Sequence, residues 1–264
     1  MSGVALSVEN RVALITGGSR GIGAATVRLF REAGARVAFN YRSAQAAAEA
    51  LVAECGGPKV CAAFAQELST PEDGRALVRR TVETFGRIDI LVVNHGVWPA
   101  QDVSIATMAD EQWRNTLSIN LDSVFGLIQA AAGAMQEQAR PAAGGPAGHI
   151  VLVSSTAGQR GEAFHADYAA SKGAIISMTK GLATELAPAG IQVNCVAPGW
   201  VRTEMSAPAL SDPATREKVF SAIPMGRVAD PREIAGPILF LCTPLAGFMT
   251  GEIVNVNGGA VLVG

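Results

Sequence analysis

The chain has 264 residues, of which 49% are hydrophobic, 5% are aromatic and 17% are charged, and its formal net charge is −2. This apolar content excludes a chain that is disordered throughout, and the length suits one large α/β domain. The near-zero charge excludes the basic surface that nucleic-acid binding requires.

No segment is expected to direct the chain out of the cytoplasm or into a membrane. Residues 1–10 lack the basic and then apolar pattern of a signal peptide. The uncharged stretch 234–251 approaches the length of a membrane span, but Pro237 and Pro244 interrupt it, which predicts a buried helix, a loop and a strand start. The cysteines at 55, 61, 195 and 242 lack CxxC or metal-ligand spacing, which predicts buried thiols in a reducing cytoplasm and no metal site.

Apolar runs and helical spacings alternate along the whole chain. The runs are continuous, which is typical of strands buried on both faces of a parallel sheet, and they cover residues 12–16, 36–40, 60–64, 88–93, 149–154, 191–195 and 253–256. Helical spacing fills the intervals at residues 22–33, 43–55, 71–85, 110–139, 167–187 and 230–242. This order predicts a doubly wound (Rossmann) α/β fold, with about seven parallel strands and helices on both faces, as a single domain over residues 1–264.

Two segments break the alternation. Residues 139–148 are rich in Pro, Gly and Ala, which predicts a flexible surface loop. Residues 203–225 contain Pro208, Pro213 and Pro224 and follow a strand end. A long insertion at such a position can form a lid over a substrate site.

A glycine-rich turn joins the first predicted strand to the first predicted helix. Its spacing, Gly17-x3-Gly21-x-Gly23, is a variant of the dinucleotide-binding fingerprint. Glycines let the backbone approach a pyrophosphate closely, and the N-terminus of the following helix supplies free N–H groups and a positive dipole. We therefore expect a dinucleotide here, contacted by Gly17, Ser19, Arg20, Gly21, Ile22 and Gly23.

The end of the second strand indicates which nucleotide is bound. NAD sites place an Asp or Glu there to hold the ribose hydroxyls, whereas this chain has Asn40, Tyr41, Arg42 and Ser43. A carboxylate would repel a 2′-phosphate, while the guanidinium groups of Arg20 and Arg42 match phosphate oxygens. The pattern therefore favours NADP(H) over NAD(H).

A tyrosine and a lysine at helical spacing follow the fifth predicted strand. Tyr168 and Lys172 are four residues apart, so they share one face of the predicted helix 167–187. A nearby ammonium favours the phenolate, which should lower the pKa of Tyr168 and suit it to acid–base catalysis. Ser155 comes at the carboxyl end of the preceding strand, where ligands bind in open α/β sheets, so its hydroxyl can contact the same substrate oxygen.

Taken together, these features resemble the short-chain dehydrogenase/reductase family, and within it the 3-oxoacyl-ACP reductase-like members. The resemblance covers nearly the whole chain and rests on motifs that follow one another in family order. They are Thr16-Gly17-x3-Gly21-x-Gly23, Asn94-x-Gly96, Asn120, Ser155, Tyr168-x3-Lys172, Asn194-x-Val196-x-Pro198-Gly199-x3-Thr203 and Thr250-Gly251-x3-Asn255-Val256-x-Gly258-Gly259.

The resemblance implies hydride transfer between a nicotinamide and a ketone or secondary alcohol. Tyr168 would be the general acid/base and Ser155 would orient the carbonyl. Lys172 would hold the nicotinamide ribose and tune Tyr168, and Asn120, in the long helix, would hold a water of the proton relay. The nicotinamide carboxamide would be lined by Pro198, Gly199, Val201 and Thr203.

Two positions depart from the family pattern beside the adenosine. In Asn94-His95-Gly96 an imidazole replaces the usual methyl group, while Asn94 would brace the central strand. In Glu67-Leu68 a glutamate stands where an aspartate is frequent near the adenine. We expect all five residues to belong to the cofactor site without touching the chemistry.

The sequence leaves the substrate open. The segments 96–103, 159–165 and 203–225 match the family poorly, and apolar side chains in or beside them can line a pocket: Trp98, Phe164, Trp200, Met205 and Phe220. Residues 115–139 contain no Lys or Arg to attract an acidic carrier protein. The candidate substrates therefore include a free ketone, a sugar and a cyclic alcohol as well as a 3-oxoacyl thioester.

Two alternatives to an NADP(H)-dependent enzyme are a non-catalytic Rossmann module that senses a nucleotide and an NAD-dependent alcohol dehydrogenase. The intact pair Tyr168 and Lys172 argues against the first, and the missing acid after the second strand argues against the other. The family resemblance and the small residues on two helices predict a homotetramer, in which another subunit covers the apolar end 260–264. We expect neither a membrane nor a nucleic-acid partner.

Overall fold

A computed structural model of the chain describes residues 5–139 and 145–263. Within these residues the strands form one parallel sheet in the order β3-β2-β1-β4-β5-β6-β7. They are β1 (Val12–Ile15), β2 (Arg36–Tyr41), β3 (Cys61–Ala65), β4 (Ile90–Val93), β5 (Gly148–Val153), β6 (Ile191–Pro198) and β7 (Ile253–Val256). The strand order reverses between β1 and β4, which confirms the predicted doubly wound fold and locates its ligand crevice at that point.

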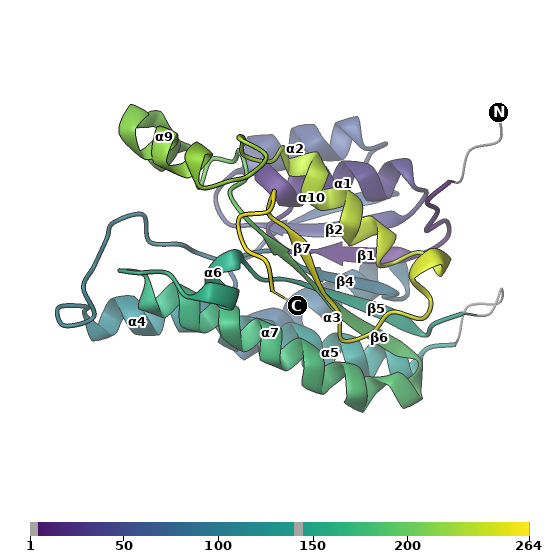
Figure 1. The fold of residues 1–264 in the computed structure, drawn as a ribbon. Coiled ribbons are helices and arrows are strands. Elements are labelled where there is room, and N and C mark those ends of the chain that lie inside the picture. Colours follow the sequence, from purple (N-terminus) through teal and green to yellow (C-terminus); the bar gives the residue numbers. More distant parts are fainter. Residues whose placement is uncertain (1–4, 140–144, 264) are drawn as a thin grey trace.

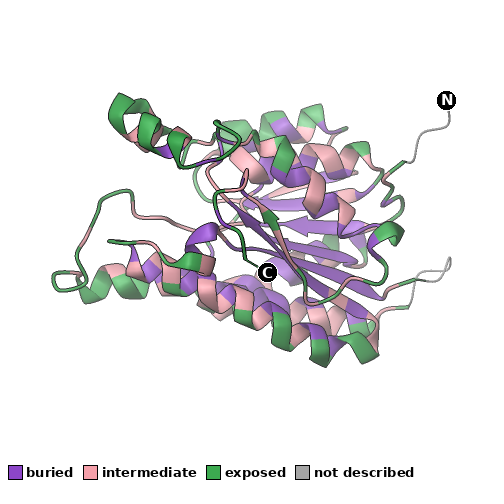
Figure 2. Ribbon diagram, viewed as in Figure 1, coloured by how far each residue is buried: buried purple, intermediate pink, exposed green. Residues whose placement is uncertain are grey.

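Helices cover both faces of the sheet (Figure 1). One apolar cluster joins the sheet to α1 (Gly21–Glu32), α2 (Gln45–Glu54) and α10 (Pro231–Phe240). The other joins it to α3 (Pro71–Phe85), α5 (Ser123–Glu137) and α7 (Ala166–Leu186). All residues of β1, β4 and β5 are buried, as Figure 2 shows for the sheet, which explains why their sequences are continuous apolar runs.

Helix α3 shows how local sequence signals set the boundaries that were predicted. Thr70 accepts a hydrogen bond from the Asp73 N–H, and the Asp73 carboxylate accepts one from the Thr70 N–H, so the pair forms a capping box. Pro71 occupies the first helical position, where its missing N–H costs nothing. Gly86 ends the helix with a φ of +80°, a left-handed conformation that favours glycine.

The single helix predicted over 110–139 is divided in the structure. It consists of α4 (Asp110–Leu117), a π-helical turn (Ser118–Asp122) and α5. By length and mean hydropathy the run Asp110–Glu137 is apolar enough to cross a membrane, but half of its apolar window is buried inside the fold. Because α5 packs along α3, this run is a core helix of the domain.

The predicted lid segment 203–225 contains two short helices that sequence analysis did not predict, α8 (Ala207–Ser211) and α9 (Pro213–Ser221). They project from the carboxyl edge of the sheet (Figure 1). Val219, Ile223 and Val228 form a small apolar cluster of their own there. A further short helix, α6 (Thr156–Arg160), was also missed, and residues 140–144 of the predicted loop 139–148 lie outside the described residues.

Candidate active site

The glycine-rich turn leaves the carboxyl end of β1 and enters α1, as predicted. Gly17 has a φ of +64°, which a residue with a side chain rarely adopts. The turn is held from two sides, because Asn40 Oδ1 accepts from the Gly17 N–H (2.8 Å) and Asn94 Nδ2 donates to the Thr16 carbonyl (3.0 Å). Arg20, at the N-cap of α1, makes no side-chain capping hydrogen bond. The first N–H groups of α1 are therefore left for an anion.

One cavity follows the carboxyl ends of the strands and brings nearly all predicted site residues together. Its lining includes Gly17, Ser19, Arg20, Gly21, Ile22, Asn40, Tyr41, Arg42, Ser43, Glu67, Leu68, Asn94, His95, Gly96, Ser155, Tyr168, Lys172, Pro198, Gly199, Val201 and Thr203. Two predicted residues are absent from the lining. Gly23 lies under the turn, where a Cβ would collide with the Gly17 carbonyl, and Asn120 lies just behind Gly96.

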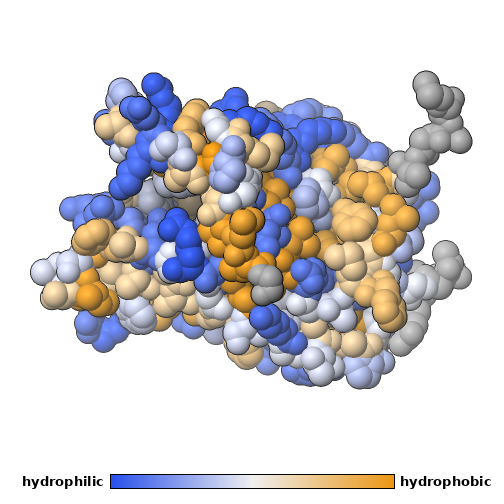
Figure 3. Space-filling model, in the orientation of Figure 1, coloured by the Kyte–Doolittle hydropathy of each residue, from blue (hydrophilic) through white to orange (hydrophobic). Residues whose placement is uncertain are grey.

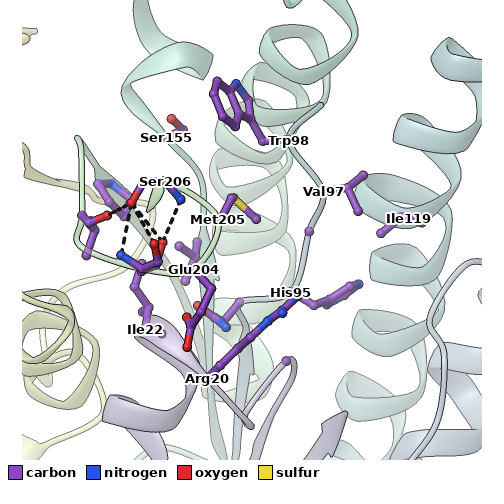
Figure 4. Close-up of a pocket in the computed structure, with 18 of the residues that line it drawn as sticks. Arg20, Ile22, His95, Val97, Trp98, Ile119, Ser155, Glu204, Met205 and Ser206 are labelled. Atoms are coloured by element: carbon purple, nitrogen blue, oxygen red, sulfur yellow. Dashed lines mark hydrogen bonds between the residues drawn. The ribbon is translucent and has the colours of Figure 1, made fainter. Parts of the chain in front are cut away.

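The substrate half of the cavity agrees in part with the predicted apolar residues. Trp98, Trp200 and Met205 line it, and Figure 4 shows Trp98 near Ser155 at the end away from Arg20. Phe164 and Phe220 do not line it. Phe164 is 55% exposed on a backbone with positive φ, and Phe220 packs against the apolar cluster of the lid segment.

Sequence analysis missed a further set of lining residues. Most of them adjoin predicted positions or lie in the poorly matched segments, so proximity along the chain was the signal available. They are Ala44, Gln66, Val97, Ile119, Val153, Ser154, Thr156, Ala157, Arg160, Glu162, Glu204 and Ser206.

At the adenosine end of the cavity, Arg42 is not a free cation, although the sequence analysis expected it to bind a 2′-phosphate. Arg42 Nη1 lies 3.6 Å from Glu67 Oε1, and both side chains are largely exposed. The predicted phosphate partner is therefore shared with a carboxylate. Asn40 is buried and its amide holds the Gly17 N–H and the Gln66 carbonyl, so it braces the turn.

Ser155, Tyr168 and Lys172 meet in the middle of the cavity. Ser155 caps α6, because its Oγ accepts from the Ala157 N–H (3.1 Å), and its hydroxyl lies near enough to Tyr168 to influence the pKa of the phenol. Lys172 Nζ donates to the Val153 carbonyl (2.9 Å) and lies 5.8 Å from the centre of the Tyr168 ring. An ammonium has three N–H donors, so this arrangement leaves capacity for the hydroxyls of a cofactor ribose.

The expected lowering of the Tyr168 pKa is wrong for this structure. Burial raises the pKa of Tyr168 to about 12, the interaction with the Ser155 hydroxyl opposes the rise, and the Glu162 carboxylate adds to it. Burial also lowers the pKa of Lys172 to about 8, and its Nζ is directed at the Val153 carbonyl. Tyr168 is therefore a phenol at neutral pH, which is the form that donates a proton.

Asn120 lies in the π-helical turn between α4 and α5, a kind of irregularity that is frequent at functional sites. Its Oδ1 accepts from the Val97 N–H (2.9 Å), and its Nδ2 donates to the Val97 carbonyl (3.1 Å) and to Ser171 Oγ (3.0 Å). Asn120 thus ties the segment after β4 to α7. Its expected role as the ligand of a relay water stays a prediction.

His95, the departure from the family pattern, lines the cavity and links two elements through its imidazole. Its Nδ1 lies 2.8 Å from Thr16 Oγ1, and its Nε2 lies 2.9 Å from Ser123 Oγ. Ser123 donates its own proton to the Ile119 carbonyl (2.8 Å), so Nε2 carries the hydrogen. Burial lowers the pKa of His95 to about 3, and the ring is a neutral brace between β1 and α5.

A parallel sheet with its switch point between β1 and β4, a glycine-rich turn and a Ser–Tyr–Lys cluster define a dinucleotide-dependent oxidoreductase. A family model described as enoyl-(acyl carrier protein) reductase matches residues 17–261. The chain belongs to the short-chain dehydrogenase/reductase family.

The curated relatives described here are reductases, and their sequences match this chain over nearly its whole length. The 3-oxoacyl-(acyl-carrier-protein) reductase of Vibrio cholerae is 37% identical over 261 residues, which is 98% of this chain and all of the relative. An acetoacetyl-CoA reductase of Shinella zoogloeoides is 35% identical over 254 residues, covering 96% of this chain and all of the relative. These names favour neither a non-catalytic module nor an alcohol dehydrogenase.

Two solved structures that are similar to this chain contain a nicotinamide cofactor. A 3-ketoacyl-(acyl-carrier-protein) reductase of Brucella melitensis complexed with NADH has a TM-score of 0.86 and 32% identity, covering 97% of this chain and all of that one. A blue fluorescent protein from a metagenomic library, in complex with NADPH, has the same TM-score, identity and coverage. A nicotinamide dinucleotide is thus the cofactor class, and the cavity described above has the backbone N–H groups and arginines to hold its phosphates.

Proposed function

We propose that the protein is an NADP(H)-dependent reductase that converts the keto group of a 3-oxoacyl thioester into a secondary alcohol. The observation that carries the proposal is the half-buried Tyr168 phenol, which lines the dinucleotide cavity together with Ser155 and Lys172. A group that stays protonated at neutral pH is suited to donating a proton to a carbonyl that is being reduced.

The side chains divide the work at the carbonyl oxygen. When bound, the nicotinamide supplies the hydride. Ser155 Oγ already accepts from the Ala157 N–H, so its own O–H can donate to the carbonyl oxygen. Tyr168 donates the proton to that oxygen, and the Lys172 ammonium, 5.8 Å from the ring centre, stabilises the phenolate that remains.

The choice of NADP(H) rests on the second strand. No carboxylate follows β2, and Arg20 and Arg42 line the adenosine end of the cavity. The pairing of Arg42 with Glu67 weakens this preference without reversing it, because an exposed ion pair contributes little and a 2′-phosphate can displace it.

The substrate class is supported by the names of the relatives, which act on carrier-bound or CoA-bound oxoacyl groups. These substrates are not small free carbonyl compounds. The relatives therefore disfavour the hypothesis, left open by the sequence, that the substrate is a free ketone or a sugar. We further propose a cytoplasmic location, since all four cysteines are buried free thiols, and a homotetramer with the C-terminal residues at an interface, since Leu262 is 88% exposed on the single chain.

The test is a steady-state assay of acetoacetyl-CoA reduction with NADPH, comparing the wild type with Tyr168→Phe. Tyr168→Phe should bind NADPH normally and lose roughly 10²- to 10⁴-fold in kcat, the usual contribution of a positioned proton donor. NADPH binding without reduction of any 3-oxoacyl thioester by the wild type would refute the substrate assignment. Turnover of Tyr168→Phe near the wild-type rate would remove Tyr168 from the mechanism.

A further inference from the structure

Two tryptophans from distant parts of the chain meet beside the reactive carbonyl position. Trp98 follows β4 and Trp200 follows β6, and their rings pack edge to face with centroids 6.0 Å apart at 81°. Both line the cavity that contains Ser155 and Tyr168. On the face shown in Figure 3, the surface is hollowed beneath the lid helices, where this cavity opens.

Trp98 is held in place from its other side as well. Its ring stacks on His165 with centroids 5.0 Å apart and an angle of 17°. His165 is only 3% exposed and precedes α7, the helix that carries Tyr168. Because Trp98 lies between a buried ring and a second indole, it cannot turn aside without breaking two packing contacts.

A carboxylate completes this wall. Glu162 lies in the loop between α6 and α7, lines the cavity and interacts with the Trp98 indole. The negative charge of Glu162 raises the pKa of Tyr168. Burial raises the pKa of Glu162 itself. An alkyl chain laid against this carboxylate would remove water from it without offering a hydrogen bond, which is unfavourable.

The size of a thioester substrate decides which of its ends meets the wall. A carbonyl held at Ser155 and Tyr168 has two substituents, and the one that continues into the thioester and its carrier is too large to be enclosed. It has to leave through the open side of the cavity. The alkyl end of the acyl group has to stay inside the cavity, whose lining includes Trp98, Trp200 and Glu162.

We propose that Trp98, Trp200 and Glu162 form an end wall that restricts the enzyme to short 3-oxoacyl groups of the acetoacetyl class. This inference rests on the proposed function and names its substrate range. In an open apolar groove each additional methylene would tighten binding by roughly fourfold. At this wall, additional methylenes would collide with the two indoles and would remove water from the Glu162 carboxylate.

The experiment measures kcat/KM with NADPH for 3-oxoacyl-CoA substrates of four, six and ten carbons. For the wild type we expect a fall of at least roughly tenfold from four to ten carbons, the opposite of the gain that methylene burial would produce. Trp98→Ala should raise the ratio of the ten-carbon to the four-carbon value roughly tenfold. Glu162→Leu should shift the profile in the same direction, and Glu162→Gln, of the same size, should shift it less.

Trp113→Ala is the matched control, because Trp113 lies on α4, is 36% exposed and does not line the cavity. NADPH titration of each variant shows that the dinucleotide site is intact. The end wall is refuted if the wild type prefers ten carbons, or if Trp98→Ala changes all chain lengths equally. If no thioester is reduced at all, the proposed function fails separately. The length profile is then expected, or refuted, with the symmetrical ketones 3-pentanone, 5-nonanone and 9-heptadecanone, in which one arm has to meet the wall whichever way the ketone binds.

Discussion

Replacing Glu67 by Gln should tighten NADPH binding and leave NADH binding nearly unchanged. Two unit charges 3.6 Å apart, the separation of Arg42 Nη1 and Glu67 Oε1, interact by about 1.2 kcal/mol in water. Both side chains are largely exposed, so salt and side-chain entropy reduce this to at most about 1 kcal/mol. A 2′-phosphate has to draw Arg42 away from Glu67, and removing the carboxylate should therefore gain up to about fivefold in affinity.

The assay is a titration with NADPH and with NADH, following nicotinamide fluorescence, for the wild type, Glu67→Gln, Arg42→Ala and the double variant. Arg42→Ala should weaken NADPH by about tenfold or more, since hydrogen bonds to charged groups contribute about 1.5 to 3 kcal/mol. In its background Glu67→Gln should have no further effect. Asp110→Asn, which breaks the exposed Arg114–Asp110 pair outside the cavity, is the control. A gain from Glu67→Gln that is equal for both nucleotides, or that persists without Arg42, would refute the reasoning.

Three further changes test other parts of the structure. Ser155→Ala removes a donor to the carbonyl and the N-cap of α6, so it should lower kcat by about tenfold or more and the free energy of unfolding by about 1 kcal/mol; unchanged urea unfolding would show that the cap contributes nothing. Between pH 8 and 10.5 the unfolded chain retains a proton on Lys172 that the folded chain has released, so stability from this group should rise with pH. Urea midpoints of Lys172→Met should lack that rise relative to the wild type; parallel curves would contradict the lowered pKa. Deleting residues 260–264 should reduce the mass measured by light scattering, and an unchanged mass would exclude an interface there.

The order of elements could be predicted because its signals are local. Strands buried on both faces show as continuous apolar runs, and all seven predicted runs became strands, with ends shifted by at most three residues. The largest shift is in β6, which continues to Pro198 because its last residues pair with β7. The helices α6 and α8 were missed because five residues are too few for a helical period to appear, and α9 was missed because its sequence has almost no amphipathic pattern.

The sequence by itself determined which residues come to the carboxyl edge of the sheet, because strand ends, the glycine-rich turn and the spacing of Tyr168 and Lys172 are properties of short segments. Only the tertiary structure decided their electrostatics. It packed protein around Tyr168 and placed the Glu162 charge within its reach, so the phenol pKa rose where proximity to Lys172 alone predicted a fall.

The same distinction holds for contacts between distant segments. His95 bridges Thr16 and Ser123, and Trp98 meets Trp200 about a hundred positions further along the chain. No periodicity within one segment encodes such a meeting, because it depends on how the loops after β4 and β6 are brought together once the sheet has formed. Site membership therefore follows from local pattern, whereas protonation and the shape of the substrate pocket follow from packing between segments that are remote in the sequence.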